Sequence, residues 1–547
     1  MGLSRTLLRP VAYVAGLRVG RVVNSFLAAH RQTGATQQQV LRELIAAHRE
    51  TDFGRDHGFA RIGGYEDFAR AVPMGDYETL RPYMDRVLAG QTAALLPAGE
   101  EALMFSQTSG TTGRPKLIPV TRRFAGQMRR GWNIFGFRML QQHRDAWLRS
   151  ILQISSPLRE TVSPTGLPCG AISGLLAREQ LNIVRRMYVV PMETSSIADP
   201  LARLYVTLRC GIERDVAVIT TANPSSTIKM IETGQAHAPR LIRDIAEGAI
   251  TPPAEVDRRL LAGIRLRPNL PLARKLDQCL ARDGTLLPRH FWNVSVLMNW
   301  TGATLKLYIP RLRELFGPCV PIRDIGLLAS EGRFSIPLND ETAAGVAEIT
   351  GNFLEFMPIE ERDASQPRTV LAHQTQIGQE YFLVVTNWAG LWRYNLDDRV
   401  RVVGKLGESP IFEFLSRGLH TASITGEKIT EYQVVEAMRL ASAALGASVE
   451  RFMLQGRFAA RPYYELRLEA PPGMDAADLA RRMDEELGRL NVEYRSKRSS
   501  DRLGPIQPVV LADGALDAQE RQAILARRGR SEQYKHKYLM TDVLPVQ

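Results

Sequence analysis

The sequence predicts an α/β fold with two domains: a large N-terminal domain of mixed β-sheets and packed helices, and a small α+β C-terminal domain. Two observations lead to this prediction. The chain has 547 residues, of which 44% are hydrophobic and 23% charged, which is typical of a globular protein too long for one core. Apolar runs also alternate with amphipathic stretches along most of the chain, and strands that alternate with helices build layered α/β domains.

The predicted N-terminal domain, residues 1–425, begins with helices. Residues 1–60 are expected to be helical, with an amphipathic first helix and no signal peptide, because apolar side chains recur at helical spacing in VLRELIAAHRE. The apolar runs WLRSILQIS, DVAVITT and YFLVVTNW are predicted strands, and the amphipathic stretches ARLYVTLRCGI and TIKMIETGQ are predicted helices. The stretch VSPTGLPCGAISG is rich in Gly, Pro and Ser and is predicted to be a loop.

The predicted C-terminal domain, residues 426–547, has a different pattern. A helix, two strands, a helix, a strand and a helix are expected in turn after Ile429. Their sequences are EYQVVEAMRLASAAL, RFMLQG, YYELRLEA, AADLARRMDEEL, PIQPVVLA and LDAQERQAILARR. The segment before them, TASITGEKITE, is short and polar, as expected of a hinge between domains.

Composition and charge exclude several classes of protein. The four cysteines form no CxxC pair and the nine histidines no HExxH motif, so we expect neither a disulfide framework nor a structural metal site, and a cytoplasmic location. No run of apolar residues is long enough for a membrane span. The net charge of +12 admits a nucleic-acid partner. We expect none, because the arginines between Arg122 and Arg149 fit a solvated helix face or a pocket wall equally well.

The segment FSQTSGTTGRPKLIPVT, residues 105–121, predicts a phosphate-binding loop. Glycines let main-chain N–H groups approach one anion, and neighbouring hydroxyl groups add further donors. Arg-Pro-Lys follows the last glycine, so the segment is not a Walker A motif. Surface turns also contain Ser, Thr and Gly, but a run of this length between apolar flanks favours phosphate binding. The predicted loop residues are Thr108, Ser109, Gly110, Thr111, Thr112, Gly113 and Lys116.

Three further segments carry charged groups suited to a nucleotide. In GLLASEGRFSIP, Ser330 and Glu331 follow an apolar run, where a carboxylate can bind magnesium held by phosphates. In GLWRYNLDDRVRVVG, a turn is expected around Tyr394 and Asp398, and an ionised aspartate can accept hydrogen bonds from both ribose hydroxyls. Two lysines occur late in the chain, Lys428 at the hinge and Lys535 near the C-terminus.

Taken in order, these segments resemble the Gretchen Hagen 3 acyl acid amido synthetases of the adenylate-forming superfamily. The resemblance extends from about Thr51 to Lys535. It includes TDFGRDHGF, TSGTTGRPKLIPVT, GLPCGAISG, ANPSS, ASEG, FLEFMPIEE, TNWAGLWRYNLDD, PIFEFLSRG and GEKITE. The chain is rich in arginine and poor in lysine, which indicates a bacterial member from a GC-rich genome.

The resemblance implies an ATP-dependent acid–amine ligase. Such an enzyme forms an acyl-adenylate from a carboxylic acid and ATP with magnesium and releases pyrophosphate. An amino acid or another amine then attacks the acyl carbon to give an amide and AMP. By motif position, Ser109, Thr111 and Thr112 would hold the phosphates, and Glu331 would bind magnesium or the α-phosphate region. Asp398 would hold the ribose, and Arg417 would contact ribose or phosphate. The C-terminal domain, residues 426–547, would be a mobile lid, and Lys428 at its hinge and Lys535 within it would stabilise adenylate formation.

The chain departs from the family pattern at the ribose turn. The pattern is Tyr-Arg-x-Gly-Asp, and this chain has Asn395 and Asp397 at the arginine and glycine positions. Aspartate tolerates the left-handed conformation that glycine adopts easily, but it adds a negative charge near the nucleotide. Two outcomes are open: either nucleotide affinity is weakened, or a neighbour such as Arg393 or Arg399 replaces the missing arginine.

Four alternatives stay open at this point. The acyl group could pass to coenzyme A or to a carrier-protein thiol, because the adenylation step is shared. The chain could also be a non-catalytic relative with a degraded nucleotide site, or a nucleic-acid binder. The acid is expected to be apolar or aromatic, because aromatic side chains follow the phosphate loop, although such residues are also common in cores. They are Trp132, Phe135 and Phe137, with Met139 beside them.

Overall fold

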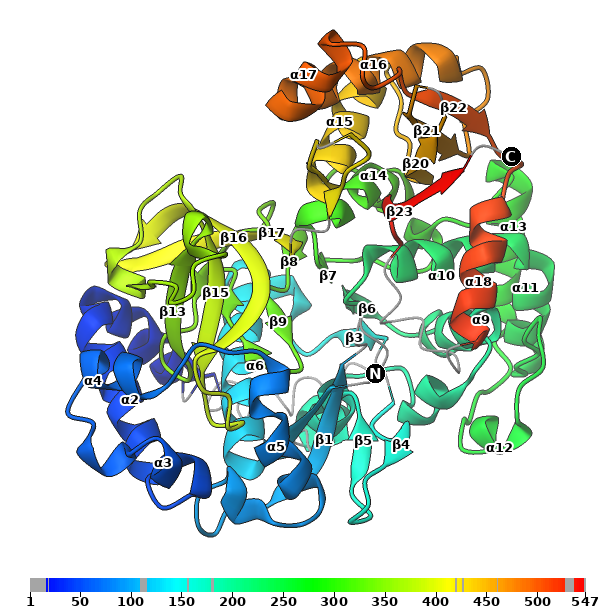
Figure 1. Ribbon diagram of the computed structural model, residues 1–547. Coiled ribbons are helices and arrows are strands. Elements are labelled where there is room, and N and C mark those ends of the chain that lie inside the picture. The colour runs from blue at the N-terminus through cyan, green and yellow to red at the C-terminus, as the bar shows by residue number, and fades with distance from the viewer. Residues whose placement is uncertain are drawn as a thin grey trace. The chain divides into compact units, whose positions relative to one another are not determined.

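The computed structural model describes residues 16, 17, 19–108, 116–154, 157–178, 182–418, 421–425, 427–459, 461–526 and 536–545. The chain forms two compact units (Figure 1). The first unit comprises Met1–Ile197, Leu201–Trp300 and Pro318–Phe414, and the second comprises Ala198–Pro200, Thr301–Gly317 and Leu415–Gln547. The α/β class is confirmed. The division into residues 1–425 and a mobile part, 426–547, stays a prediction.

Short helices form the N-terminal part of the first unit. They are α2 (Thr33–His48), α3 (Asp52–Asp56), α4 (Tyr65–Ala71) and α5 (Tyr77–Leu88). Helix α2 confirms the helix predicted from apolar spacing, because Leu41, Leu44 and Ile45 are buried in a core with strands of the largest sheet. Side chains cap α3 and α5: Thr51 accepts a hydrogen bond from the N–H of Gly54, and Asp76 accepts from the N–H groups of Glu78 and Thr79.

The largest sheet has seven strands in the order β11-β12-β17-β16-β15-β13-β14. Their bounds are β11 (Ser335–Ile336), β12 (Gly345–Ala347), β13 (Phe353–Pro358), β14 (Val370–Leu371), β15 (Glu380–Thr386), β16 (Tyr394–Leu406) and β17 (Ser409–Arg417). Strand β15 is the strand predicted from YFLVVTNW, and it pairs antiparallel with both β13 and β16. The sheet was not predicted as an antiparallel unit, because several of its strands are too short to show a period.

A second sheet, β3-β6-β7-β8, is parallel throughout. Its strands are β3 (Ser150–Gln153), β6 (Val216–Thr220), β7 (Val296–Asn299) and β8 (Ile322–Asp324). Strand β6 is buried along its whole length, as expected of a parallel strand covered on both faces. The surrounding helices are α9 (Pro200–Gly211), α10 (Pro224–Ala236), α11 (Ala238–Glu247), α12 (Arg258–Leu261) and α13 (Leu270–Asp283). The strands predicted at β3 and β6 and the helices predicted at α9 and α10 are confirmed.

A third sheet, β2-β1-β5-β4, contains the two strands that precede and follow the predicted phosphate loop in the chain. It consists of β1 (Ala102–Thr108), β2 (Lys116–Thr121), β4 (Thr161–Val162) and β5 (Pro168–Gly170), and α6 (Arg122–Gln142), α7 (Ile172–Arg178) and α8 (Asn182–Arg185) follow its strands. The prediction of a loop over residues 162–174 is wrong. Ser163 and Leu167 close a tight turn with two hydrogen bonds. The flanking residues are strands, because β4 pairs with β5 and β5 pairs with β1.

The second unit has its own sheet, β22-β21-β20-β23, and its own core. The strands of this sheet are β20 (Phe452–Phe458), β21 (Tyr463–Leu468), β22 (Gln507–Val510) and β23 (Leu539–Pro545). Two short strands, β18 (Thr421–Ala422) and β19 (Ile429–Thr430), pair separately. Its helices are α14 (Ile309–Phe316), α15 (Glu431–Ala443), α16 (Ala476–Leu490), α17 (Val492–Ser499) and α18 (Ala515–Ala526). The six elements predicted after Ile429 are confirmed, whereas α17 and β23 were missed. None of the helices in the described ranges has the length and apolar character needed to cross a membrane.

Candidate functional site

The predicted phosphate loop lies between two paired strands. Thr108 is the last residue of β1 and pairs with Lys116, the first residue of β2. The predicted loop residues between them, Ser109, Gly110, Thr111, Thr112 and Gly113, lie outside the described part of the chain. The structure therefore gives the position of the base of this loop.

Lys116 contacts the strand that carries the predicted ribose ligand. Its ammonium group donates a hydrogen bond of 3.2 Å to the hydroxyl of Tyr394 and lies 5.8 Å from the centre of that ring. Tyr77 fixes the neighbouring backbone, because its hydroxyl accepts a hydrogen bond from the N–H of Leu117 and donates one to its carbonyl. Two residues predicted from separate motifs, Lys116 and Tyr394, are thus in direct contact.

The predicted turn at residues 394–398 is wrong, because these residues belong to β16. The register changes between two neighbouring pairs, Phe382–Arg399 and Val384–Asn395. Three residues of β16 therefore lie opposite one residue of β15, which makes a β-bulge. Such bulges redirect side chains and are common beside active sites. Asp398 lies in this bulge and is buried.

Asp397, at the family's glycine position, has the left-handed conformation that a glycine would adopt. Its φ is 58°, and its N–H donates a hydrogen bond of 2.9 Å to the side-chain oxygen of Asn395. Its carboxylate lies 3.6 Å from the guanidinium of Arg362. The two residues that depart from the family pattern therefore support one another, and a cation faces the added negative charge.

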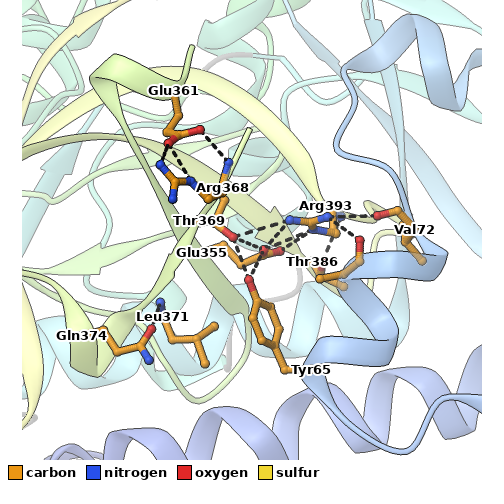
Figure 2. A network of polar contacts seen from close by, with 11 residues as sticks. Tyr65, Val72, Glu355, Glu361, Arg368, Thr369, Leu371, Gln374, Thr386 and Arg393 are labelled. Atoms are coloured by element: carbon orange, nitrogen blue, oxygen red, sulfur yellow. Dashed lines mark hydrogen bonds and ion pairs between the residues drawn. The ribbon is translucent and has the colours of Figure 1, made fainter. Parts of the chain in front are cut away.

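Arg393 does not replace the missing arginine, and that expectation is wrong. Its guanidinium donates to both carboxylate oxygens of Glu355 and to the carbonyls of Ala69 and Val72, so all of its donors are directed into the protein (Figure 2). Glu355 is fully buried and Arg393 nearly so. Arg399, the other expected replacement, donates to the carboxylate of Glu380.

Ser330 and Glu331 form the turn of a two-stranded hairpin. The hairpin consists of β9 (Leu328–Ala329) and β10 (Gly332–Arg333), with Ala329 paired to Gly332. The side-chain amide of Asn387 donates a hydrogen bond of 2.7 Å to the carbonyl of Glu331. Sequence analysis assigned no role to Asn387, which lies within the predicted strand YFLVVTNW and directly follows the observed strand β15. It fixes the turn that carries the predicted magnesium ligand.

The segment 387–393 is anchored in the core by two tryptophans. Trp392 is buried and stacks on Phe53, with ring centres 5.7 Å apart. The guanidinium of Arg123 lies over the ring of Trp388, 3.1 Å from its centre.

The backbone of the same segment packs closely at Gly390. Gly390 has a φ of 76°, and a Cβ there would lie 2.6 Å from the side chain of Leu95. This rigid segment connects Asn387, which holds Glu331, to Tyr394.

Helix α6 contributes the aromatic residues predicted to shape an acid pocket. Phe135 and Met139 are buried in a core cluster, and Trp132 and Phe137 are partly buried beside it. The guanidinium of Arg333 lies over Trp132, 4.6 Å from the ring centre. Much of this group is therefore core, and a role in binding the acid stays a prediction.

The predicted residues Arg417, Lys428 and Lys535 are assigned to the second unit. Arg417 ends β17. Lys428 is exposed, and its carbonyl accepts a hydrogen bond of 2.8 Å from Asn491. Lys535 lies outside the described residues.

Metal binding by protein groups alone finds no support in the described residues, which include no group of three His, Cys, Asp or Glu side chains that could hold an ion. Magnesium bound to a nucleotide needs only one or two carboxylates in addition to phosphate oxygens. Glu331, a carboxylate in a hairpin turn, fits that smaller requirement.

Comparison with known protein families identifies the family of the chain. The N-terminal, central and C-terminal domain models of the GH3 (Gretchen Hagen 3) family match residues 22–322, 346–417 and 432–543. The chain belongs to the GH3 family. The resemblance inferred from the motifs is therefore confirmed.

Relatives with described activities support the same assignment. The chain is 28% identical over 541 residues to the probable indole-3-acetic acid-amido synthetase GH3.1 of Oryza sativa subsp. japonica, covering 92% of this chain and 86% of the relative. It is 24% identical over 445 residues to the jasmonoyl–L-amino acid synthetase JAR4 of Nicotiana attenuata, covering 78% and 76%. The solved structure of the GH3.15 acyl acid amido synthetase has the same fold, with a TM-score of 0.83, 22% identity and coverage of 95% and 94%. This GH3 protein is an ATP-dependent acid–amine ligase.

Proposed function

We propose that this GH3 protein activates a carboxylic acid with ATP and magnesium as an acyl-adenylate and passes the acyl group to an amino acid. The contact between Lys116 and Tyr394 is the observation that supports the proposal most directly. It joins the base of the predicted phosphate loop to the strand of the predicted ribose ligand, Asp398.

The proposed reaction has two steps. A carboxylate oxygen attacks the α-phosphorus of ATP, and the bond to pyrophosphate breaks. The amine nitrogen then attacks the acyl carbon, the bond to AMP breaks, and the amine loses a proton to solvent. Acid and ATP are both anionic, so donors and cations arranged beforehand lower the barrier of the first step.

Most of the predicted residues have a specific role in this scheme. Ser109, Thr111 and Thr112 donate hydrogen bonds to phosphate oxygens, with Thr108, Gly110 and Gly113 shaping the loop. Glu331 holds magnesium, which when bound offsets phosphate charge. Asp398 accepts hydrogen bonds from the ribose hydroxyls, and Arg417 contacts ribose or phosphate. Lys428 and Lys535 act from the mobile C-terminal part, which closes for adenylation and then moves to admit the amine.

The substrates are an apolar or aromatic acid and an amino acid. The names of the relatives describe amido synthetases for indole-3-acetic acid and a jasmonoyl–amino acid synthetase. The partly buried Trp132 and Phe137 of α6 are suited to an apolar acid. The arginine-rich, lysine-poor composition supports a bacterial source and the unpaired cysteines a cytoplasmic location.

The test measures pyrophosphate release with ATP, magnesium and pools of carboxylic acids, with hydroxylamine present to trap an acyl-adenylate as a hydroxamate. The wild-type protein should release pyrophosphate only with its acid, and mass spectrometry should identify the hydroxamate. Glu331→Gln and Lys535→Ala should each lower the rate at least tenfold. Lys537→Ala is the matched control, because Lys537 is an exposed lysine two positions away.

The same assay tests the acceptor. An amino acid that yields an amide in place of the hydroxamate supports the proposal, whereas acyl transfer only to coenzyme A or to a carrier thiol contradicts the proposed second step. Absence of acid-dependent pyrophosphate release, with no thermal stabilisation by ATP, contradicts adenylation itself.

A further inference from the structure

A pocket of about 460 Å³ lies in the first unit, between α2 and the segment 59–65. Pockets of this size hold small organic ligands. Its walls are formed by Gln38, Leu41, Arg42, Ile45, Ala46, Arg49, Phe59, Ala60, Ile62, Gly63, Gly64 and Tyr65. The residues from α2 recur every three or four positions, so they share one face of the helix and its C-terminal cap. None of the residues predicted to bind the nucleotide belongs to this wall.

The lining combines an apolar floor with two cations. Leu41, Ile45 and Phe59 are core residues whose side chains also face the pocket. Arg42 and Arg49 are both exposed, and the lining includes no carboxylate. The lining therefore suits a ligand with an apolar body and an anionic group.

Among the described residues, the two guanidinium groups have only weak partners. Arg42 donates a hydrogen bond to the side-chain amide of Gln39, which carries no charge. Arg49 pairs with Glu50 at 3.2 Å, and both side chains are more than half exposed. Such solvated pairs contribute little, whereas arginine binds a carboxylate through two parallel hydrogen bonds. A ligand carboxylate can therefore recruit either of these arginines at small cost.

Tyr65, which forms part of the pocket wall, is also a member of a buried polar network. The hydroxyl of Tyr65 donates a hydrogen bond of 3.0 Å to Glu355 and contacts the hydroxyl of Thr369 at 2.7 Å (Figure 2). Burial and the neighbouring Glu355 raise the pKa of Tyr65 to about 12, so the hydroxyl keeps its proton. Glu355 in turn binds Arg393, the residue before β16. The network thus runs from the pocket to the strand of Tyr394 and Asp398.

We infer that this pocket is a second site for a carboxylate with an apolar body, and that its occupancy changes ATP binding through Tyr65, Glu355 and Arg393. The effect on ATP rests on the proposed function of β16, whereas the carboxylate site does not. Two sources share this chemistry: the free acid, and an N-acyl amino acid such as the amide product. The site would let the concentration of either compound adjust adenylation.

The binding test uses the full chain and isothermal titration calorimetry. Octanoate represents the free acid, N-octanoylglycine the conjugate, and octanol the same apolar body without charge. We expect carboxylate binding to weaken at least tenfold in Arg42→Gln/Arg49→Gln, and octanol to bind less well to the wild type. Arg31→Gln/Arg55→Gln is the matched control, because it removes two exposed arginines outside the pocket. If octanoate binds more tightly, the ligand is a free acid; if N-octanoylglycine binds more tightly, it is an N-acyl amino acid.

The coupling test measures KM for ATP with and without the tighter probe. We expect the probe to change KM in the wild type and to have no effect in Tyr65→Phe, which keeps the ring in the wall and removes the hydrogen bond to Glu355. Absence of binding at millimolar concentration, or equal loss in the two arginine pairs, overturns the site. Arginine-dependent binding in a protein that adenylates no acid supports the site and contradicts only the proposed function.

Discussion

Asp397 shows how one substitution in a family motif can be accommodated. A residue other than glycine at a φ of 58° is strained, but the hydrogen bond to Asn395 and the ion pair with Arg362 favour this conformation. The remaining consequence is electrostatic, because the carboxylate lies next in sequence to the predicted ribose ligand.

Replacing Asp397 by glycine should therefore improve ATP binding. Asp397→Gly removes one negative charge and needs no change of backbone conformation, so KM for ATP should fall by about two- to fivefold. The change in unfolding free energy should stay within roughly 1 kcal/mol. Steady-state kinetics of pyrophosphate release measure the first effect. Asp501→Gly is the control, because Asp501 has a φ of 59° and belongs to the second unit. A rise in KM would contradict this account of the motif.

His48 makes the stability of the first unit depend on pH. The side chain is fully buried, its Nδ1 donates to the carbonyl of Leu44, and its ring lies 4.9 Å from that of Trp392. Burial lowers the pKa of His48 from 6.5 to about 4. The unfolded chain therefore binds the proton first as the pH falls. The stabilisation is complete above pH 6.5 and is lost as the pH decreases towards 4.

Denaturant unfolding followed by tryptophan fluorescence should detect this loss. Between pH 7 and pH 4 the wild type should lose on the order of 3 kcal/mol through His48. His48→Phe keeps an aromatic ring but has no titrating group, so its pH dependence should be smaller by that amount. His57→Phe serves as the control. His57 belongs to the same aromatic core, because it stacks on Phe53, but it is less buried than His48. Equal acid sensitivity in all three proteins would exclude His48 as the cause.

At the scale of elements, the segment 387–393 is the structural centre of the candidate site. It begins with Asn387, which holds the hairpin of Glu331, and leads into Tyr394, which contacts Lys116. Two distant motifs are thereby fixed by one short connection between β15 and β16.

Asn387→Ala should impair adenylation more than it impairs folding. Loss of the hydrogen bond to the carbonyl of Glu331 should lower the rate of pyrophosphate release about tenfold, because one buried hydrogen bond contributes about 1–3 kcal/mol when its partner is left behind. Thr386→Val is a suitable comparison, since it removes a buried hydrogen bond to the N–H of Arg393 and none to Glu331. If both variants lose activity in proportion to melting temperature, Asn387 acts through stability alone.

The sequence predicted those elements whose pattern is local. Helix α2 and strands β6 and β15 have long apolar patterns, and the motifs around Glu331 and Asp398 stand out by residue type. The bulge in β16 and the role of Asn387 depend on pairing with residues far along the chain. The prediction of a loop over residues 162–174 was wrong for a related reason. Gly, Pro and Ser occur both in open loops and in tight hairpin turns such as the one at Ser163.

At the scale of the whole molecule, the second unit is discontinuous in sequence, and no local pattern could reveal this. Residues 301–317 lie in the middle of the chain but belong to the second unit. Leu307 is buried in the core of that unit. Lys306 pairs with Glu436 of α15, and although burial favours the neutral carboxyl group, hydrogen bonds from Arg439 and Lys306 lower the pKa of Glu436 to about 2.

This organisation makes a prediction about the C-terminal part of the chain, which the family resemblance implies to be mobile. If residues 301–317 move with the C-terminal part, a covalent link between positions 306 and 436 should leave both reaction steps intact. We expect Lys306→Cys/Glu436→Cys, joined by a short bismaleimide in a Cys319→Ser background, to adenylate and to form amide within about twofold of the unlinked protein. Cys319 is replaced because it is the exposed native cysteine among the four.

The unlinked double variant controls for loss of the ion pair, and mass spectrometry verifies the link. Pyrophosphate release with loss of amide formation would mean that residues 301–317 separate from α15 between the two steps. In that case the polar segment 423–428 would act as the hinge, as the sequence predicts. Retention of both steps would instead require the chain to flex wherever it passes between the units, around residues 198–200 and near residues 300, 318 and 415. A body that includes residues 301–317 cannot turn about one connection.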